Sequence, residues 1–191
     1  MKRTVQVAKG ISGNVSSRVD AFVFEGSIED GEDAAARLAE RIRESLGSVS
    51  VLVNASQAAK VGDRLEATKP ADLSVALDTG LVSSYLLMRA FYPQLKENAG
   101  LVVNLLSAGT ASGQQGMSLL AASKEGLRGL SRVAANEWAQ DGIRVECLEP
   151  QVRSRAFEKW AAEYPDAVAE FECLEPVEEF AAHVLALAGA C

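Results

Sequence analysis

The chain has 191 residues, of which 48% are apolar and 24% are charged, and its formal net charge is −7. This length is typical of one domain with a sizeable core, so residues 1–191 are expected to form a single domain. The negative charge argues against a nucleic-acid partner, and no apolar run reaches the roughly 18 residues that a membrane span needs.

Cysteine and histidine usage limits the expected compartment and metal chemistry. The three cysteines (Cys147, Cys173 and Cys191) are scattered along the chain. An odd number without paired spacing is typical of reduced thiols, so a cytoplasmic location is expected. The only histidine is His183, and because no Cys/His cluster surrounds it, no metal site is expected.

The N-terminal region predicts two short strands with little chain between them. The segments TVQVA (4–8) and AFVF (21–24) have strand character, and twelve residues separate them. A parallel crossover that contains a helix needs about that many residues or more, so two geometries stay open. The strands form either an antiparallel hairpin or a parallel pair joined by a very short helix, and the hairpin is favoured because such a helix is marginal.

The rest of the chain alternates apolar runs with helical periodicity. Strands are predicted at 49–54, 101–106 and 143–148, because these apolar runs are too short for helices. Helices are predicted at 34–46, 71–98, 117–140, 157–162 and 177–188. Alternating strands and helices predict an α/β fold with a largely parallel sheet that is covered on both faces.

Four segments resemble, in order, landmarks of the short-chain dehydrogenase/reductase (SDR) family. They are SIEDGEDAAARLAERIRESLGSVSVLVNAS from Ser27, GLVSSYLLMRAFYPQL from Gly80, LVVNLLSAG from Leu101 and LLAASKEGLRGLSRVAANEWAQDGIRVECLEP from Leu119. Each is weak alone, but together they cover most of the chain. The resemblance implies a Rossmann-like, doubly wound, mostly parallel sheet of about five strands. Its N-terminal strand–turn–strand is shortened, and the final family strand is missing.

The resemblance also implies a chemistry, which is hydride transfer between a nicotinamide ring and a carbonyl carbon. In the family a tyrosine is the acid, a lysine one turn later lowers its pKa, and a serine and an asparagine assist. Ser107 falls at the serine position and Lys124 at the lysine position. Leu120 stands at the tyrosine position and cannot donate a proton, and Gly80 stands at the asparagine position. Tyr85, in the preceding helix, is expected in the core.

The cofactor half of the resemblance is incomplete. The family's glycine-rich loop lets the backbone approach the cofactor pyrophosphate. Here only Gly10 and Gly13 remain at that loop, and Asn54 keeps part of the family's Asn-Asn-Ala-Gly strand end. Gln57 stands at a family glycine, where its bulk would narrow the nicotinamide side. No cofactor is therefore expected, and NAD(P) is the cofactor only if the chain is an active reductase.

The favoured hypothesis is a truncated, degenerate SDR, similar to 3-oxoacyl-ACP-reductase-like proteins, that acts as a pseudoenzyme. It would form a homodimer, or a heteromer with an intact SDR, through helices 71–98 and 117–140. The first helix is apolar on more than one side, and the second carries small residues that allow close helix approach. The alternative is an NAD(P)-dependent oxidoreductase, a 3-oxoacyl or related carbonyl reductase, with an atypical active site. A Ser107–Lys124 hydrolase is less favoured.

Overall fold

The computed structural model describes residues 31–152, 155–163 and 174–189. The predicted strands at 4–8 and 21–24 lie outside these residues, and so do Gly10 and Gly13. The described elements are α2 (Gly31–Leu46), β1 (Val51–Asn54), a 3₁₀ turn (Leu65–Ala67), α3 (Pro70–Leu77), a π-helical segment (Asp78–Val82), α4 (Ser83–Glu97), β2 (Leu101–Leu105), α5 (Ser118–Trp138), a 3₁₀ turn (Ala139–Asp141), β3 (Arg144–Leu148), α6 (Arg155–Glu163) and α8 (Val177–Gly189).

The three described strands form a parallel sheet in the order β1-β2-β3. Val51 pairs with Leu101, which pairs in turn with Arg144, so the strands run in register. Because the strands are parallel, all three carboxyl ends lie at one edge, where ligands bind in open α/β sheets. The predicted α/β, Rossmann-like fold is confirmed, and the segments after the strands (55–63, 106–117 and 149–152) meet at this edge.

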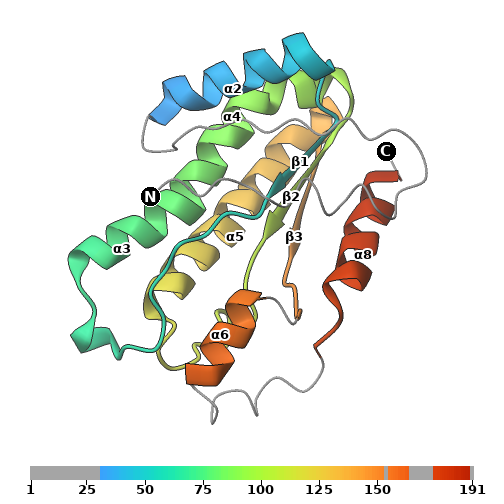
Figure 1. Cartoon of the computed structure of the whole chain (residues 1–191). Helices are drawn as coiled ribbons and strands as arrows, with labels where there is room; N and C mark the ends of the chain where they lie inside the picture. Colours follow the sequence, from blue (N-terminus) through green and yellow to red (C-terminus); the bar gives the residue numbers. More distant parts are fainter. Residues whose placement is uncertain (1–30, 153–154, 164–173, 190–191) are drawn as a thin grey trace.

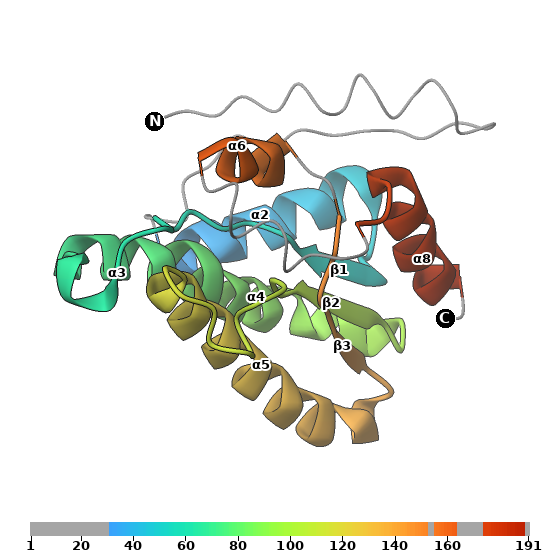
Figure 2. The same cartoon turned by 90° about the horizontal axis from the view of Figure 1, so that it is seen from below.

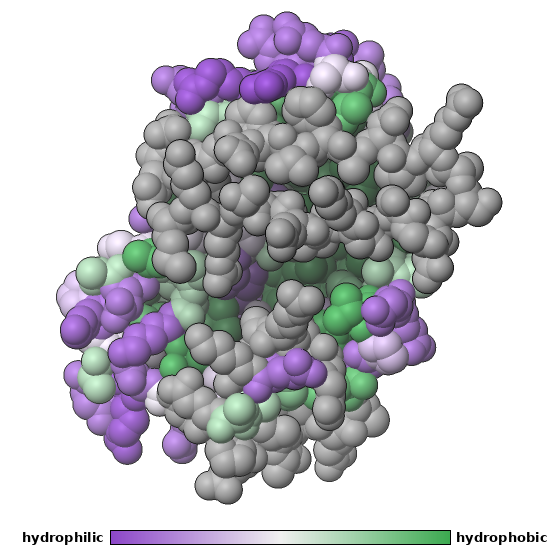
Figure 3. Space-filling model, viewed as in Figure 1, coloured by the Kyte–Doolittle hydropathy of each residue, from purple (hydrophilic) through white to green (hydrophobic). Residues whose placement is uncertain are grey.

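Helices α2, α4 and α5 share one hydrophobic core with the sheet. The core cluster joins side chains from all four parts, among them Ala39, Phe91, Leu95, Val102 and Ala134. Figures 1 and 2 show α4 and α5 on one side of the strands and α6 on the other. In Figure 3 hydrophilic residues gather over α2 at the top of the molecule, as expected for an amphipathic helix whose other face is buried.

The predicted helix at 71–98 forms, but it is not one regular helix. A π-helical segment separates α3 from α4, and Gly80 lies within it. Side-chain hydroxyls bond to carbonyls around this step: Ser83 Oγ donates to Thr79 O (2.8 Å) and Ser84 Oγ to Gly80 O (2.6 Å). Such steps inside α-helices are frequent at functional sites.

Tyr85 corrects one expectation. The residue was predicted to lie in the core, but 40% of it is exposed. The Arg89 guanidinium lies 5.5 Å from the centre of its ring, and Arg89 Nη1 donates to the Tyr85 hydroxyl at 3.3 Å. Met88 and Phe91 fill the core instead, because the helix turns Tyr85 to its outer side.

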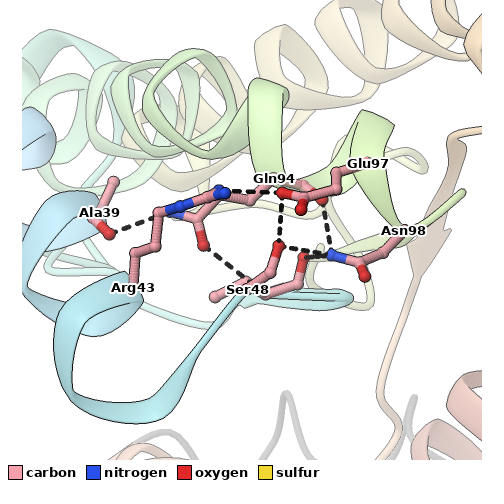
Figure 4. A network of polar contacts seen from close by, with 7 residues as sticks. Ala39, Arg43, Ser48, Gln94, Glu97 and Asn98 are labelled. Atoms are coloured by element: carbon pink, nitrogen blue, oxygen red, sulfur yellow. Dashed lines mark hydrogen bonds and ion pairs between the residues drawn. The ribbon is translucent and has the colours of Figure 1, made fainter.

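A polar network fixes the turn between α2 and β1 against the end of α4 (Figure 4). The buried Gln94 side chain donates to Ala39 O (2.9 Å) and accepts from Val49 N–H (3.0 Å). Around it, Asn98 Nδ2 donates to Ser48 Oγ, and Arg43 pairs with Glu97 at 2.9 Å. Gln94 therefore couples the start of the sheet to the helical layer.

Helices α6 and α8 follow the last strand. Arg144 Nη2 donates to Leu187 O at 2.9 Å, and an isolated parallel bridge joins Val152 to Glu175. In Figure 1 α8 lies beside β3. None of the α8 residues is buried, although the helix is mostly apolar. Within the described residues, no helix has the length and apolar character required to cross a membrane.

Gln94→Ala tests the network. The substitution should lower the free energy of unfolding by about 1–3 kcal/mol, because Val49 N–H and the carbonyl of Ala39 each lose a partner. Urea unfolding measures the effect. Arg43→Ala is the control: its ion pair with Glu97 is about half exposed, so less than ~1 kcal/mol is expected. A smaller loss for Gln94→Ala than for Arg43→Ala would contradict this assignment.

Candidate active site

A cavity of about 380 Å³ opens at the carboxyl edge of the sheet. Segments after all three strands contribute to it, together with the start of α5 and with α6. The residues within the described ranges that line it are Gln57, Ala59, Val61, Leu106, Ser107, Ala108, Met117, Leu120, Pro150, Gln151, Val152, Phe157, Trp160 and Leu174. The volume lies in the range of small-molecule sites, and the position is the usual one for this sheet type.

Ser107 and Leu120 line the same cavity. Ser107 follows β2 by two residues, and Leu120 lies in the first turn of α5. The polar side-chain groups among the described lining residues are the Ser107 hydroxyl, the amides of Gln57 and Gln151, and the indole N–H of Trp160, which is far too weak an acid to act as one here. A general acid needs a pKa near the working pH, and neither an aliphatic hydroxyl nor an amide has one. The described part of the cavity therefore holds no general acid.

Gly80 lies under the side chain of Gln57. A Cβ atom added to Gly80 would come within 2.1 Å of Gln57 Oε1 and 2.3 Å of Ser123 Oγ. Gln57 Nε2 donates to Ala76 O at 3.1 Å, and Ser123 Oγ donates to Gln57 Oε1 at 3.3 Å. Gln57 and Ser123 thus fill the space above residue 80, and no side chain fits there unless both of them move.

Lys124 is buried, with 3% of it exposed. Its Nζ donates to the carbonyl of Leu105, at the end of β2, at 2.8 Å. Burial lowers the pKa of the Lys124 amine to about 8, because the charged form is poorly solvated there. Lys124 is not among the residues that line the cavity. Its observed contact ties α5 to the strand end next to Ser107.

Asn54 belongs to a buried polar chain under the site. Asn54 Nδ2 donates to Asn104 Oδ1 (2.7 Å), and Asn104 Nδ2 donates to Ser131 Oγ (2.8 Å). Ser131 donates in turn to Leu127 O at 2.7 Å, so the chain crosses β1, β2 and α5. Asn54 Oδ1 is buried and accepts no hydrogen bond from the described residues. The Asn54 amide therefore holds the strands and α5 together rather than lining the cavity.

Two loops that flank the cavity contact each other through glycines. Gly62 N–H donates to Gly116 O at 2.8 Å. Gly116 has a φ of +78°, and a Cβ atom there would lie 2.9 Å from the Gly62 Cα. Only glycine fits at position 116. The close contact between Gly62 and Gly116 therefore holds the loop that carries Val61 against the loop that leads to Met117.

Ser123, Phe157 and Trp160 are among the residues of the site that were not predicted. Ser123 meets Gln57 across 66 positions of sequence, and nothing local to either residue signals that contact. The sequence around Phe157 and Trp160 predicted only a helix. In the structure both side chains line the cavity, and their rings form a tilted pair with centres 5.7 Å apart. Nowhere in the described ranges do three or more His, Cys, Asp or Glu residues gather in a way that could hold a metal.

Comparison with known proteins decides the family. Residues 1–163 match the family described as short chain dehydrogenase, which is most of the chain. The chain belongs to the short-chain dehydrogenase/reductase family. The predicted resemblance is confirmed, including the likeness to 3-oxoacyl-ACP reductases.

Two curated relatives show how far the match extends. A 12alpha-hydroxysteroid dehydrogenase from a Clostridium species is 34% identical over 139 residues, which are 73% of this chain and 54% of the relative. A human 3-oxoacyl-[acyl-carrier-protein] reductase is 32% identical over 149 residues, 78% of this chain and 61% of the relative. This SDR chain thus spans little more than half the length of the curated relatives it matches.

Solved structures give the same fold. The structure described as ElxO with NADP bound has a TM-score of 0.77 at 22% identity, covering 86% of this chain and 69% of that one. A short-chain dehydrogenase from Streptomyces avermitilis has a TM-score of 0.62 at 31% identity, covering 69% and 49%. Both support the Rossmann-like SDR architecture.

Gly80→Ala tests the packing of Gln57. The added Cβ should lower the free energy of unfolding by about 1–3 kcal/mol, because it overpacks the space that Gln57 fills. In Gln57→Ala/Gly80→Ala the loss should be smaller than the sum of the single losses, by about 1 kcal/mol or more. Gly189→Ala, where the added Cβ meets no atom within 4 Å, is the control and should change little. Additive losses would contradict the contact.

Lys124→Met tests the buried amine through pH. Between pH 8 and 10.5, the folded and the ordinary pKa, the unfolded chain binds more protons, so the native state gains stability as pH rises. Relative to Lys124→Met, the unmodified chain should gain up to about 3 kcal/mol over this range. Urea unfolding at several pH values measures the difference. Lys96→Met should show no such gain, because Asp141 raises the pKa of Lys96. A pH-independent difference for Lys124→Met would rule out the burial effect.

Proposed function

We propose that this chain is an SDR pseudoenzyme, which does not reduce carbonyl compounds with a nicotinamide cofactor and acts by association. One observation carries the proposal: Leu120 lines the cavity with Ser107, and the described lining offers no proton donor of suitable pKa. A ketone bound there would meet a hydroxyl, amides and apolar side chains. Its oxygen would receive no proton as hydride arrived, so the barrier to reduction would stay high.

Gln57 and Gly80 support the same proposal. At the position of the relay asparagine, Gly80 has no side chain, and the Gln57 amide above it is already bonded to Ala76 O and Ser123 Oγ. Its hydrogen-bonding groups connect α3 to α5 beside Gly80. We therefore assign Ser107 and Lys124 as remnants of the family's catalytic set, and we propose a packing role for Gln57.

The outer side of α4 and α5 supports association. On α5 the residues Ala122, Gly129 and Val133 lie on one exposed stripe, whereas Gly126 between them already packs against Leu81 of the same chain. Val133 is 53% exposed, and a Cβ atom at Gly129 would meet no atom within 4 Å. On the neighbouring helical segment Val82 and Tyr85 are also exposed. Small residues let a facing helix approach closely, so a symmetric pair of α4–α5 surfaces is the simplest assembly.

The second candidate is an NAD(P)-dependent oxidoreductase with an atypical site. The names of the curated relatives favour it, since they are a hydroxysteroid dehydrogenase and 3-oxoacyl reductases. Ser107 and the buried Lys124 are also the residues such an enzyme would keep. Under this alternative the proton would have to come from a group outside the described lining, and a nicotinamide cofactor would bind.

Thermal melting with NADPH, NADH and NAD separates the two candidates. A ligand at a hundredfold its dissociation constant stabilises a protein by about 2.7 kcal/mol, which shifts the melting temperature measurably. The pseudoenzyme proposal predicts no shift with any of the three at millimolar concentration. A reproducible, saturable rise with one of them would favour the oxidoreductase.

Light scattering tests the association. At micromolar concentration the chain should have the mass of a dimer, and Val133→Asp should reduce it to a monomer because it places a charge in the α4–α5 surface. Leu185→Asp is the matched control, since Leu185 is 68% exposed on α8, and it should leave the dimer intact. A monomeric unmodified chain, or equal effects of the two substitutions, would refute the proposed interface.

A further inference from the structure

Residues 56–58 join the cavity to the π-helical step between α3 and α4. Thr79, in the step, is bonded to both ends of this segment. Ala58 N–H donates to Thr79 Oγ1 at 2.9 Å, and Ser56 Oγ donates to Thr79 O at 3.1 Å. Between these two residues, Gln57 lines the cavity. One short segment therefore borders the cavity and is hydrogen-bonded to the helical step.

The Gln57 side chain also contacts the helices on both sides of the step. Its Nε2 donates to Ala76 O in α3, and Ser123 Oγ in α5 donates to its Oε1. A Cβ atom at Gly80 would lie 2.1 Å from Gln57 Oε1, so the amide lies directly against the backbone of the step. Displacing this one side chain from its position would remove contacts to α3, to α5 and to the step together.

The step determines which side chains turn inward where it passes into α4. Leu81 packs against α5, since a Cβ atom at Gly126 would lie 2.9 Å from Leu81 Cδ2, whereas Val82 is 39% exposed. Because π-helical turns are rare and occur mostly as single turns inside α-helices, the step depends on the contacts around it. Relaxation toward α-helical pairing would rotate nearby side chains by up to about 100°, the angle between successive residues of an α-helix. Leu81 would then leave Gly126, and Val82 would leave its exposed position.

The contact between Leu81 and Gly126 lies at the proposed association surface. Gly126 is three residues before Gly129, which belongs to the exposed stripe of α5. Val82 and Tyr85 are the exposed residues of the same surface at the start of α4. A change in the step therefore alters the shape that a second copy of the chain has to match.

We propose that residues 56–58 couple the cavity to the α4–α5 surface, so that displacing the Gln57 side chain weakens the association of two copies. The inference rests on the proposed function, because it takes α4–α5 as the association surface. A molecule that entered the cavity and moved Gln57 would then dissociate the dimer. Such coupling is reciprocal, so formation of the dimer also has to stabilise the contacts of residues 56–58 with the step.

Two glutamines of the cavity give a matched pair of variants. The readout is the dimer dissociation constant, measured by sedimentation velocity over a concentration series. Gln57→Ala should weaken the dimer by about fivefold or more, the lower end of typical coupling between two sites. Gln151→Ala is the control, because Gln151 lines the same cavity from the segment after β3, and its effect should stay within about twofold.

A third variant separates coupling from a general loss of stability. Gln94→Ala removes two hydrogen bonds at the opposite edge of the sheet, so it destabilises the fold without touching the step. It should leave the dimer dissociation constant within about twofold of that of the unmodified chain. Equal weakening of the dimer by Gln57→Ala and Gln94→Ala would assign the effect to lost stability and overturn the coupling.

Hydrogen exchange on the unmodified chain tests the reciprocal effect and needs no variant. The Ala58 amide is bonded to Thr79 Oγ1, and the Val49 amide is bonded to Gln94 Oε1. Val49 reports the general stabilisation that association gives to the whole fold. Above the dimer dissociation constant, exchange at Ala58 should slow by a larger factor than exchange at Val49. Equal slowing at the two amides overturns the coupling, even if Gln57→Ala does not fold.

The remaining outcomes separate this inference from the association proposal. A dimer that responds equally to Gln57→Ala and Gln151→Ala overturns the coupling and leaves the association standing. A dimer that Val133→Asp does not dissociate, but that Gln57→Ala does, moves the interface elsewhere and overturns both. An unmodified chain that stays monomeric throughout the concentration series also overturns both.

Discussion

The parallel pairing of β1, β2 and β3 is the constraint on which the rest of the structure depends. It places the three carboxyl ends at one edge, and the segments that follow them can then enclose a cavity. The buried chain from Asn54 through Asn104 to Ser131 fixes that arrangement from below, because it bonds both strands to α5. At the opposite edge of the sheet, Gln94 of α4 accepts a hydrogen bond from the backbone N–H of Val49, just before β1. The sheet and the buried hydrogen bonds that shape an SDR site are therefore present here although the tyrosine and asparagine of the catalytic set are not.

Within this frame the replacements are mutually consistent. Gly80 has no side chain, and Gln57 occupies the space above it and hydrogen-bonds to Ala76 O and Ser123 Oγ. Leu120 adds an apolar side chain to the cavity lining. Lys124 keeps a buried hydrogen bond to the strand end. Gly80, Gln57 and Lys124 lie in packed or hydrogen-bonded surroundings, and Leu120 borders the cavity. We infer that the site is maintained as a binding and packing structure, which accords with the proposed association through α4 and α5.

Much of the frame followed from local patterns, and most of the site detail did not. Short apolar runs predicted β1, β2 and β3, and the family spacing brought Ser107 and Leu120 to one place. The π-helical step at Gly80, the Gln57–Ser123 contact and the exposure of Tyr85 were missed. Each depends on which distant side chain fills a space or which side a helix turns outward, and hydrophobic periodicity carries neither kind of information. The predicted strands and glycines before residue 31 lie outside the described residues.

We propose that this SDR chain cannot carry out carbonyl reduction, chiefly because Leu120 stands where the family has its tyrosine acid. The most direct measurement is NADPH consumption, followed at 340 nm, by the unmodified chain and by Leu120→Tyr with a panel of ketones that includes a 3-oxoacyl thioester. Neither should consume NADPH above the protein-free blank, because restoring one hydroxyl does not restore the asparagine at position 80 or the cofactor-binding positions. Stoichiometric turnover by the unmodified chain, or activity that appears in Leu120→Tyr, would contradict it.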